Sequence, residues 1–401
     1  MATAGDVPHT GSRRGGASVS REIPAESTAG TRLACVSVFS GAMGLDLGLE
    51  AAGFDIRMAA DNMDAAARTA GVNRPDLPFF ADDARALDAK KIYELSGLGA
   101  GEVDLLAGGP PCQSFSTAGR RRGMDDIDRG PLLFEFVRLI DEVRPRAFLL
   151  ENVKGLLSAS TRWRELPHNN NGKIIDDLHG SLFRELSARL KDLGYSIDFR
   201  ELNSADYGVP QARRRVFVMG YRDGHRVSFP DATHAAGGGL LHQPWRTLGD
   251  ALSGLEDDRS YCVQFSERKL QYLKMVPAGG NWRDLPEAIQ KESMGKAFYA
   301  KGGRSGYWRR LSLDAPSPTI LTEPQNASTS LCHPIEDRPL SVRECARIQT
   351  FPDDWEFAGS GRDQYKLVGN AVPVALAEAV AKHLHASLLA QAQAAAQQIA
   401  S

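Results

Sequence analysis

The stretch LACVSVFSGAMGLDLGLEAAGFDIRMAAD, residues 33–61, decides the fold of this chain. Apolar runs at 33–39 and 54–60 are separated by a glycine-rich turn and by a segment with helical spacing at 45–53. Strand, helix and strand in this order predict one unit of an α/β sheet. Small residues at the turn let a ligand approach the backbone, and Asp61, after the second run, is placed to accept hydrogen bonds from ribose hydroxyls. The pattern is also compatible with a turn that only packs a helix on a strand, and with a NAD enzyme.

The same alternation continues as far as about residue 221. Four further apolar runs predict strands, and three amphipathic stretches predict helices. The strands are expected at 103–109, 147–150, 195–199 and 215–221, and the helices at 65–72, 131–143 and 181–194. We therefore predict an α/β fold with a doubly wound, mostly parallel sheet.

The remaining segments differ in composition from this alternating part. Residues 1–30 are rich in Gly, Ser, Thr and Ala, which predicts a disordered tail before the sheet-forming domain at 31–222. The segment 223–340 has many Gly, Pro, Trp and Arg residues and predicts a smaller, loop-rich domain, a place where binding specificity often resides. Helices are expected again at 341–385, and 386–401 is interpreted as a C-terminal tail that could extend the last helix.

Composition excludes several classes of protein. The 401 residues include 48 Lys and Arg against 50 Asp and Glu, so the chain as a whole has no basic field for nucleic acid, although local basic segments can bind it. No apolar run approaches the ~20 residues of a membrane-spanning helix, and no signal peptide is visible. The five cysteines are scattered without a CxxC pair, and the nine histidines lack ligand spacing, so neither a disulfide framework nor a metal site is expected.

Two strand ends carry candidate reactive groups. The loop GGPPCQSFSTAGRRRG, residues 108–123, follows a predicted strand and presents Cys112 at the carboxyl edge of the sheet, where ligands of such sheets bind. A free cysteine is more often a small buried apolar residue. The prolines and glycines around Cys112 argue against such a core position here. Glu151 and Asn152 end the next strand, and burial there would raise the pKa of Glu151 enough for it to donate a proton. The alternative for Glu151 is a cap on the following turn.

Basic residues gather at two further places. The run Arg120–Arg122 could lower the pKa of the Cys112 thiol, bind phosphate or belong to a solvated loop. In QARRR, residues 211–215, Arg213 and Arg215 alternate and are predicted to share one face, suited to phosphate or a base edge; the alternative is a charged, exposed strand entry. Taken alone, RECARIQTFPDDW at 343–355 and the turn pair Gly369–Asn370 look structural.

Six of these segments occur together and in a characteristic order. They are FSGAMG at 39–44, GGPPCQSFS at 108–116, ENV at 151–153, QARRR at 211–215, RECARIQTFPD at 343–353 and GNAVP at 369–373. In this order the chain resembles the C5-cytosine DNA methyltransferase family, over residues 33–385. The resemblance implies a large domain that binds S-adenosylmethionine, a smaller target-recognition domain and double-stranded DNA in the cleft between them.

The resemblance also implies a mechanism. Cys112 matches the nucleophile that attacks cytosine C6 and makes C5 nucleophilic, and Glu151 matches the acid that meets the charge at N3. Arg213 is expected to support the base near its O2, and Arg215 to order the site. A base inside a duplex cannot reach such a pocket, so the target cytosine is flipped out of the helix.

Further residues match the family's binding positions. The expected cofactor-binding residues are Phe39, Ser40, Gly41, Ala42, Gly44, Asp61, Asn62, Asp83 (with Asp82 as the alternative), Pro111, Gln113, Leu132, Asn370, Ala371 and Val372. The expected DNA-binding residues are Gln211, Arg304, Arg309, Arg310 and Thr319. Met43 departs from the family because many relatives have glycine there, so its thioether is expected to point away from the cofactor.

The expected setting follows from the same resemblance. We expect a monomer in the cytoplasm, associated with the nucleoid, with a separately acting cognate restriction endonuclease as a further partner and no membrane association. One alternative is a tRNA cytosine-5 methyltransferase on the same scaffold, and another is a non-catalytic DNA-binding relative. The long segment 223–340 favours duplex DNA, and the intact Cys112, Glu151, Arg213 and Arg215 argue for catalysis. A NAD oxidoreductase does not explain the PCQ, ENV and QARRR segments.

Overall fold

The computed structural model describes residues 32–111, 132–159, 180–222, 224–255, 260–299 and 306–400, together with Asp258. All of them belong to one compact unit, Arg32–Ser401. Several sequence predictions lie outside the described residues, namely the tail at 1–30, Cys112, Gln113, the arginine run 120–122 and Arg304.

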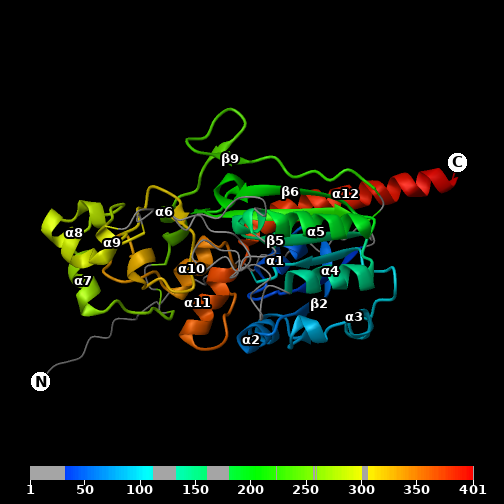
Figure 1. Ribbon diagram of the computed structural model, residues 1–401, viewed down its shortest axis with the longest axis horizontal. Helices are drawn as coiled ribbons and strands as arrows, with labels where there is room; N and C mark the ends of the chain where they lie inside the picture. The colour runs from blue at the N-terminus through cyan, green and yellow to red at the C-terminus, as the bar shows by residue number, and fades with distance from the viewer. Residues whose placement is uncertain are drawn as a thin grey trace, which may run out of the picture. The chain divides into compact units, whose positions relative to one another are not determined.

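In the described part of the chain, the main sheet has seven strands in the order β3-β2-β1-β4-β5-β8-β6 (Figure 1). The strands are β1 Leu33–Val38, β2 Phe54–Ala60, β3 Phe79–Phe80, β4 Leu105–Gly108, β5 Ala147–Asn152, β6 Ser196–Asn203 and β8 Arg214–Tyr221. Neighbouring strands are parallel, except that β8 runs antiparallel to β5 and β6. The predicted doubly wound, mostly parallel sheet is confirmed.

Helices cover both faces of this sheet. On one face lie α1 Gly44–Ala51 and α12 Val374–Ala400, and on the other α3 Ala89–Ser96, α4 Leu132–Val143 and α5 Ser181–Asp192. Successive side chains of a strand point to opposite faces, so Leu149 of β5 packs with α1 and α12 whereas Phe148 packs with α4 and α5. The apolar run of β5 is buried on both sides for this reason, as expected for a parallel sheet.

A glycine sets the distance between α1 and α12. A Cβ at Gly48 would lie 2.4 Å from the Cβ of Ala377, so only glycine allows the two helices to approach this closely. Next to this contact Leu49 and Leu376 are fully buried, each stabilising the fold by ~1.5–3 kcal/mol. This packing fixes the glycine-rich turn before α1 against the start of α12.

Four details differ from the sequence predictions. The short strand β3 and the helix α3 were not predicted. The pair Gly369–Asn370 is not a separate turn, because it forms the last two residues of α11 Gly361–Asn370. The segment 386–401, interpreted as a tail that could extend the last helix, forms no separate element as far as Ala400: α12 continues to that residue, since the Ala- and Gln-rich end has high helix propensity.

The later part of the chain is built from short elements. They are α6 Leu248–Leu252, α7 Glu267–Leu273, α8 Glu287–Met294, α9 Lys296–Tyr299 and α10 Val342–Ile348, with the strand pairs β9 His234–Ala235 with β10 Gln243–Pro244 and β7 Gln211–Ala212 with β11 Ser317–Pro318. The helices α7–α9 pack around their own apolar cluster, which includes Tyr272, Trp282 and Trp308. In Figure 1, α10 and α11 lie between these helices and the main sheet.

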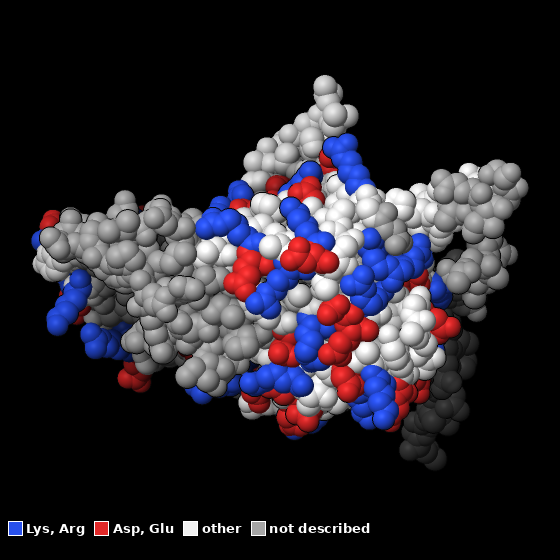
Figure 2. Space-filling model, turned by 45° about the vertical axis from the view of Figure 1, so that its right-hand side comes forward, with Lys and Arg blue, Asp and Glu red and all other residues white. Residues whose placement is uncertain are grey.

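Basic and acidic side chains are interspersed on the face shown in Figure 2. On α4 and α5, pairs four residues apart, Arg138 with Glu142 and Arg189 with Glu185, place opposite charges side by side. Such exposed pairs contribute little to stability, but they leave mixed charge rather than a basic field. No helix among the described residues is long and apolar enough to cross a membrane.

Candidate active site

The candidate site lies at the carboxyl ends of β1, β4 and β5. The chain leaves β1 toward β2 on one side, whereas β4 and β5 lie on its other side, so this is the point at which the strand order reverses. Ligands of open α/β sheets bind in the crevice that forms there. The turn after β1, Gly109–Pro111 after β4, the end of β5 at Asn152 and the start of β8 at Arg214 all lie at this edge.

The glycine-rich turn after β1 is held by Asp61. One carboxylate oxygen accepts a hydrogen bond from the Gly41 amide (2.9 Å) and the other from the Met63 amide (2.8 Å). Burial raises the pKa of Asp61, and the two backbone amides counteract part of this effect. Each carboxylate oxygen keeps acceptor capacity, because one lone pair is enough for each amide.

Met43 adopts a backbone conformation that favours glycine. Its φ is 63° and it precedes α1, which it enters from the left-handed region. The side chain is only 1% exposed and packs in the apolar cluster with Ala66, Leu340 and Phe351. The thioether therefore points into the core, in agreement with the expectation that it avoids the cofactor.

The acidic candidates after β3 are differently placed. Asp83 caps a short 3₁₀ helix and accepts three hydrogen bonds from the amide and guanidinium of Arg85, which hold the pKa of this carboxyl below its usual range. Asp82 accepts a hydrogen bond from the Asp83 amide (2.7 Å). Asn62, by contrast, is exposed beside Asp61.

Glu151 is the buried carboxyl of the site. Its side chain is 8% exposed, and one of its oxygens lies 3.3 Å from where a Cβ of Gly109 would be. The neighbouring Asn152 donates to the carbonyl of Pro110 (3.2 Å), which ties β5 to the loop that leads to Pro111 and Cys112. Burial raises the pKa of Glu151, and Arg215 and Arg213 partly offset the increase. This is the environment that the proton-donor hypothesis requires.

The two arginines of QARRR do not share a face. The backbone breaks between β7 and β8 at Arg213, so the side chains take different directions. Arg215 forms an ion pair with Glu151, with 3.1 Å between Nε and Oε1. Arg213 is 1% exposed and donates to the carbonyls of Gly369 (2.9 Å), Asn370 (3.2 Å) and Ile320 (3.4 Å). Arg215 thus lies beside Glu151, whereas Arg213 is held against the end of α11.

The junction of α11 and α12 closes the site from the other side. A Cβ on Gly44 would lie 2.2 Å from the carbonyl oxygen of Val372, so the turn before α1 directly contacts this junction. Asn370 is exposed, whereas Ala371 and Val372 are mostly buried. Leu132, at the start of α4, is buried as well.

Two expected DNA-contacting residues are buried. Gln211 is fully buried, and its amide oxygen accepts from the Ile320 amide (2.9 Å). Arg310 is 6% exposed and donates to Val276, Leu273, His333 and Glu336 carbonyls and to the carboxylate of Asp337. Both predictions are corrected on this ground, because the donors that a DNA contact needs are occupied inside the protein, that of Gln211 by the Gln349 side chain and those of Arg310 by four carbonyls and Asp337.

Arg309 and Thr319 remain at a surface hollow. The hollow has a volume of about 320 Å³, and its lining includes both residues together with Ala212 and Leu331. Thr319 donates its hydroxyl to the carbonyl of Ala212 (3.3 Å), and burial lowers the pKa of Arg309. Ala212 separates Gln211 from Arg213, so the hollow adjoins the arginine segment of the site.

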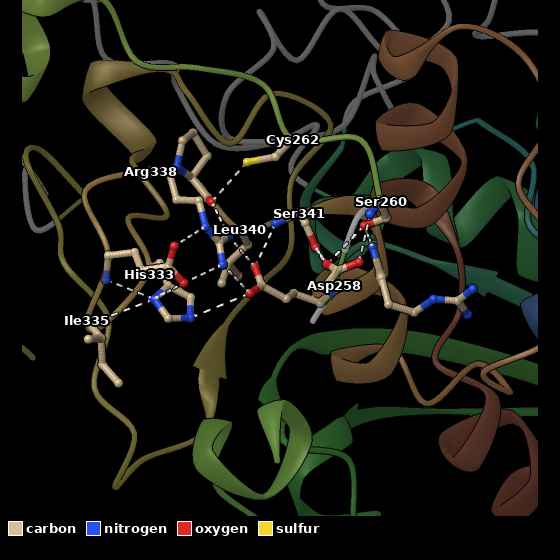
Figure 3. A network of polar contacts seen from close by, with 12 residues as sticks. Asp258, Ser260, Cys262, His333, Ile335, Arg338, Leu340 and Ser341 are labelled. Atoms are coloured by element: carbon tan, nitrogen blue, oxygen red, sulfur yellow. Dashed lines mark hydrogen bonds and ion pairs between the residues drawn. The ribbon is translucent and has the colours of Figure 1, made fainter. Parts of the chain in front are cut away.

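A polar network connects Asp258 with residues 333–344 at the start of α10 (Figure 3). Arg338 donates to both carboxylate oxygens of Glu344, each at 2.8 Å, and Ser341 donates to Asp258. His333 accepts from the Glu336 amide (3.0 Å), and burial lowers the pKa of its imidazole. The network joins the two ends of the segment 258–344 at the N-terminus of α10.

Comparison with known proteins agrees with this site. The family model of the C-5 cytosine-specific DNA methylases matches residues 33–386. The chain belongs to this family. It is 41% identical to the type II methyltransferase M.PspPI of Psychrobacter, over 86% of this chain and 77% of that protein. It is 37% identical to M.Sau96I of Staphylococcus aureus, over 86% and 74%. The chain is thus a C5-cytosine DNA methylase by family, and both of these relatives are type II methyltransferases.

Solved structures share its fold. A prophage-encoded Escherichia coli protein assigned as a DNA modification methyltransferase has 25% identity and a TM-score of 0.60, covering 89% of this chain and 99% of that one. The Dnmt2 methyltransferase of Schizosaccharomyces pombe has 18% identity and a TM-score of 0.55, covering 90% and 99%, and shows the common fold.

Two residues of this methyltransferase site were not predicted from the sequence. Gln349 is fully buried and contacts Gln211 and the end of α11. Asp46 is fully buried in the first turn of α1, and neither of its oxygens has a hydrogen-bond partner of good geometry in the described part of the chain. Position in the motif RECARIQTFPD could have pointed to Gln349, but nothing in the sequence distinguishes Asp46 from an ordinary first-turn acid.

Proposed function

We propose that this methyltransferase uses S-adenosylmethionine to methylate C5 of a cytosine flipped out of duplex DNA, within a short specific sequence. One observation carries the proposal: Glu151 is buried against the loop that leads to Cys112 and paired with Arg215. Burial raises the pKa of this carboxyl, which favours the protonated form that a proton donor needs.

The catalytic residues act in sequence. The Cys112 thiolate adds to C6, while Glu151 gives its proton to N3 and so neutralises the charge that develops there. The electron pair then available at C5 takes the methyl group, and the electrons of the broken bond stay on the sulfur of the methyl donor. Release of the C5 proton to solvent and return of the N3 proton to Glu151 re-form the double bond and expel the Cys112 thiolate. Arg215, with its remaining donors beside Glu151, supports the base near O2 in place of Arg213.

The residues around the glycine-rich turn fit S-adenosylmethionine. Asp61 keeps acceptor capacity for two ribose hydroxyls beside the Gly41 amide, and the close contact of Gly44 with Val372 leaves backbone, not side chains, around the turn. The bound cofactor supplies an electrophilic methyl group. Asn370 and Leu132 would border it, and the Arg85 pair leaves Asp83 acceptor capacity for the adenine amino group.

Target recognition is assigned to 223–340, with residues 31–222 and 341–385 forming the catalytic part. Within the recognition domain we assign DNA contacts to Arg309 and Thr319, because the hollow that they line adjoins Ala212 and hence the arginine segment. We further propose that the protein is a monomer in the cytoplasm, associated with the nucleoid. A cognate restriction endonuclease would act separately as its partner.

Transfer of a labelled methyl group to unmethylated plasmid DNA tests the function. We expect 5-methylcytosine at one short motif, complete loss of transfer in Cys112→Ser with S-adenosylmethionine binding intact, and near-normal transfer in the control Cys262→Ser, which changes a cysteine outside the site. Transfer to tRNA instead of DNA, or full activity in Cys112→Ser, would contradict the proposal.

Glu151→Gln tests the acid. The amide keeps the size of the side chain but has no proton to give up, so the rate of methyl transfer should fall by about 10²-fold or more. The binding of S-adenosylmethionine should change little. A variant that lost cofactor affinity but kept its maximal rate would remove Glu151 from this role.

A further inference from the structure

A single buried amide, that of Gln349, contacts the end of α11 and the catalytic arginine segment together. Its Nε2 donates to the carbonyls of Val368 (2.7 Å) and Ala371 (3.0 Å), and its Oε1 accepts from Nε2 of Gln211 (2.6 Å). The side chain is fully buried. Both donor hydrogens and the acceptor are therefore used, and the contacts fix which end of the amide is which.

The backbone at the same position holds the start of α12. The Gln349 carbonyl accepts from the Val374 amide (3.0 Å), and Thr350, at a φ of 61°, accepts with its hydroxyl oxygen from the Ala375 amide (2.9 Å). The side chain of Gln349 thus hydrogen-bonds Val368 and Ala371, which precede Pro373, and its main-chain carbonyl hydrogen-bonds Val374, which follows Pro373. The junction with Asn370 and Val372 is fixed from both sides.

The contact continues through Gln211 into the recognition domain. Gln211 accepts from the Ile320 amide, and Arg213 donates to the Ile320 carbonyl and to the carbonyls of Gly369 and Asn370. Gly369 packs against the segment that follows β11, since a Cβ on Gly369 would lie 2.8 Å from the carbonyl carbon of Leu321. Three segments that are distant in sequence are therefore joined by hydrogen bonds around one point.

The helix before Gln349 is fixed at its other end too. Ser341 and Glu344 form a capping box at the N-terminus of α10, and both belong to the polar network of Figure 3 through Asp258 and Arg338. The seven residues of α10 lie between Ser341 and Gln349, so this one helix connects the network to the Gln349 amide.

We propose that Gln349 is a positioning residue that sets the cofactor-lining end of α11 relative to the catalytic arginines and the segment at Ile320 that follows β11. The inference rests on the proposed function, because it assigns the α11–α12 junction to S-adenosylmethionine. Gln349 contacts neither substrate nor reacting atoms. It acts through Ala371 and through Gln211, each of which adjoins a residue of the site.

Gln349→Glu tests this role with little change in volume. The carboxylate still accepts from Gln211, but it places an oxygen opposite the carbonyls of Val368 and Ala371. We expect the Kd for S-adenosylmethionine, measured by calorimetry without DNA, to rise about ten-fold or more, because two buried hydrogen bonds become repulsive contacts. The matched control is Gln364→Glu on α11, where the amide makes one exposed contact, to Gly359 (3.3 Å), and the Kd should not change.

Gln211→Glu tests the other end of the contact. It keeps the acceptor for Ile320 and loses the donor to Gln349, so we expect a lower kcat with a smaller change in the Kd for the cofactor. Non-additive effects in the double variant would show that the two amides act as a unit. A lower melting temperature with unchanged Kd and kcat in both single variants would show a purely structural role and overturn the proposal.

A second variant and the unaltered protein complete the test. If Gln349→Glu does not fold, Gln349→Met removes the polar contacts without adding a charge, and the same rise in Kd is required of it. If the unaltered protein binds S-adenosylmethionine but transfers no methyl group to DNA, the proposed substrate fails, whereas the binding test of Gln349 still decides the positioning role.

Discussion

Replacing Asp46 with asparagine should stabilise this protein at alkaline pH. The carboxyl is fully buried in the first turn of α1, beside the hydroxyls of Ser37 and Ser40. Burial raises its pKa from the ordinary 3.8 to about 7, and the nearby Ser37 hydroxyl only partly opposes this. At pH 8 the folded protein therefore holds an unfavourable buried carboxylate.

The expected magnitude follows from the difference in pKa between the folded and unfolded states. From 3.8 to about 7 the difference corresponds to ~4 kcal/mol, at ~1.4 kcal/mol per pKa unit. Below about pH 4 both states are protonated and no penalty exists. Between about pH 4 and 7 the unfolded chain ionises first, so stability falls as the pH rises, and above about pH 7 the full penalty is present. The asparagine side chain is neutral throughout, so Asp46→Asn should gain ~2–4 kcal/mol at about pH 8 and little at about pH 4.

Urea denaturation of both proteins across this pH range measures the difference. The control is Asp64→Asn, since Asp64 also lies in the first turn of a helix but has a side chain that is 78% exposed. Its effect should stay within ~0.5 kcal/mol at every pH. The reasoning is refuted if the difference between Asp46→Asn and the unaltered protein is the same at about pH 4 and pH 8.

Two further substitutions test the packing. Met43→Gly removes the cost of a φ of 63°, which is ~1–2 kcal/mol, but it also removes a buried side chain worth ~2–5 kcal/mol. The free energy of unfolding should therefore fall by ~1–3 kcal/mol, while the Kd for S-adenosylmethionine stays unchanged. Weaker binding of S-adenosylmethionine would instead place the thioether at the cofactor. Arg310→Met leaves five acceptors without their donor and should destabilise the recognition domain by ~3–5 kcal/mol, seen as faster proteolysis within 260–340. DNA affinity lost without any change in proteolysis would return Arg310 to a direct contact.

Much of the fold could be predicted because periodicity and burial agree in the sheet. The run FDIRMAA has apolar residues at every position but Asp55 and Arg57, which stay part-exposed, and it forms β2 with the predicted bounds. The two-residue strand β3 is too short for any periodicity. The helix α3 has only Ile92 and Ser96 buried, so its apolar pattern is weak. Its N-cap residue Asp88, which accepts from the Lys91 amide (2.7 Å), is a residue type from which a helix start can be predicted.

The site was predicted less completely, for a physical reason. The alternation of Arg213 and Arg215 assumes one continuous strand, whereas the chain breaks between β7 and β8 and sends the first arginine to α11. The burial of Glu151 followed from its place directly after an apolar strand. The contact of Gln211 with Gln349 joins residues 138 positions apart, and neither side chain carries a pattern that identifies its partner.

The errors and the further inference have one cause. A loop-rich region has backbone carbonyls that no helix or sheet satisfies, and burying them requires donors from elsewhere. Arg213, Arg310 and Gln349 supply these donors, between them reaching carbonyls of α11, of the recognition domain and of the segment after α7. A long polar side chain in such a region can therefore either donate to buried backbone carbonyls of the protein or contact DNA. Burial separates the two uses, and for that reason the proposed DNA contacts are Arg309 and Thr319, which line the hollow and are not fully buried.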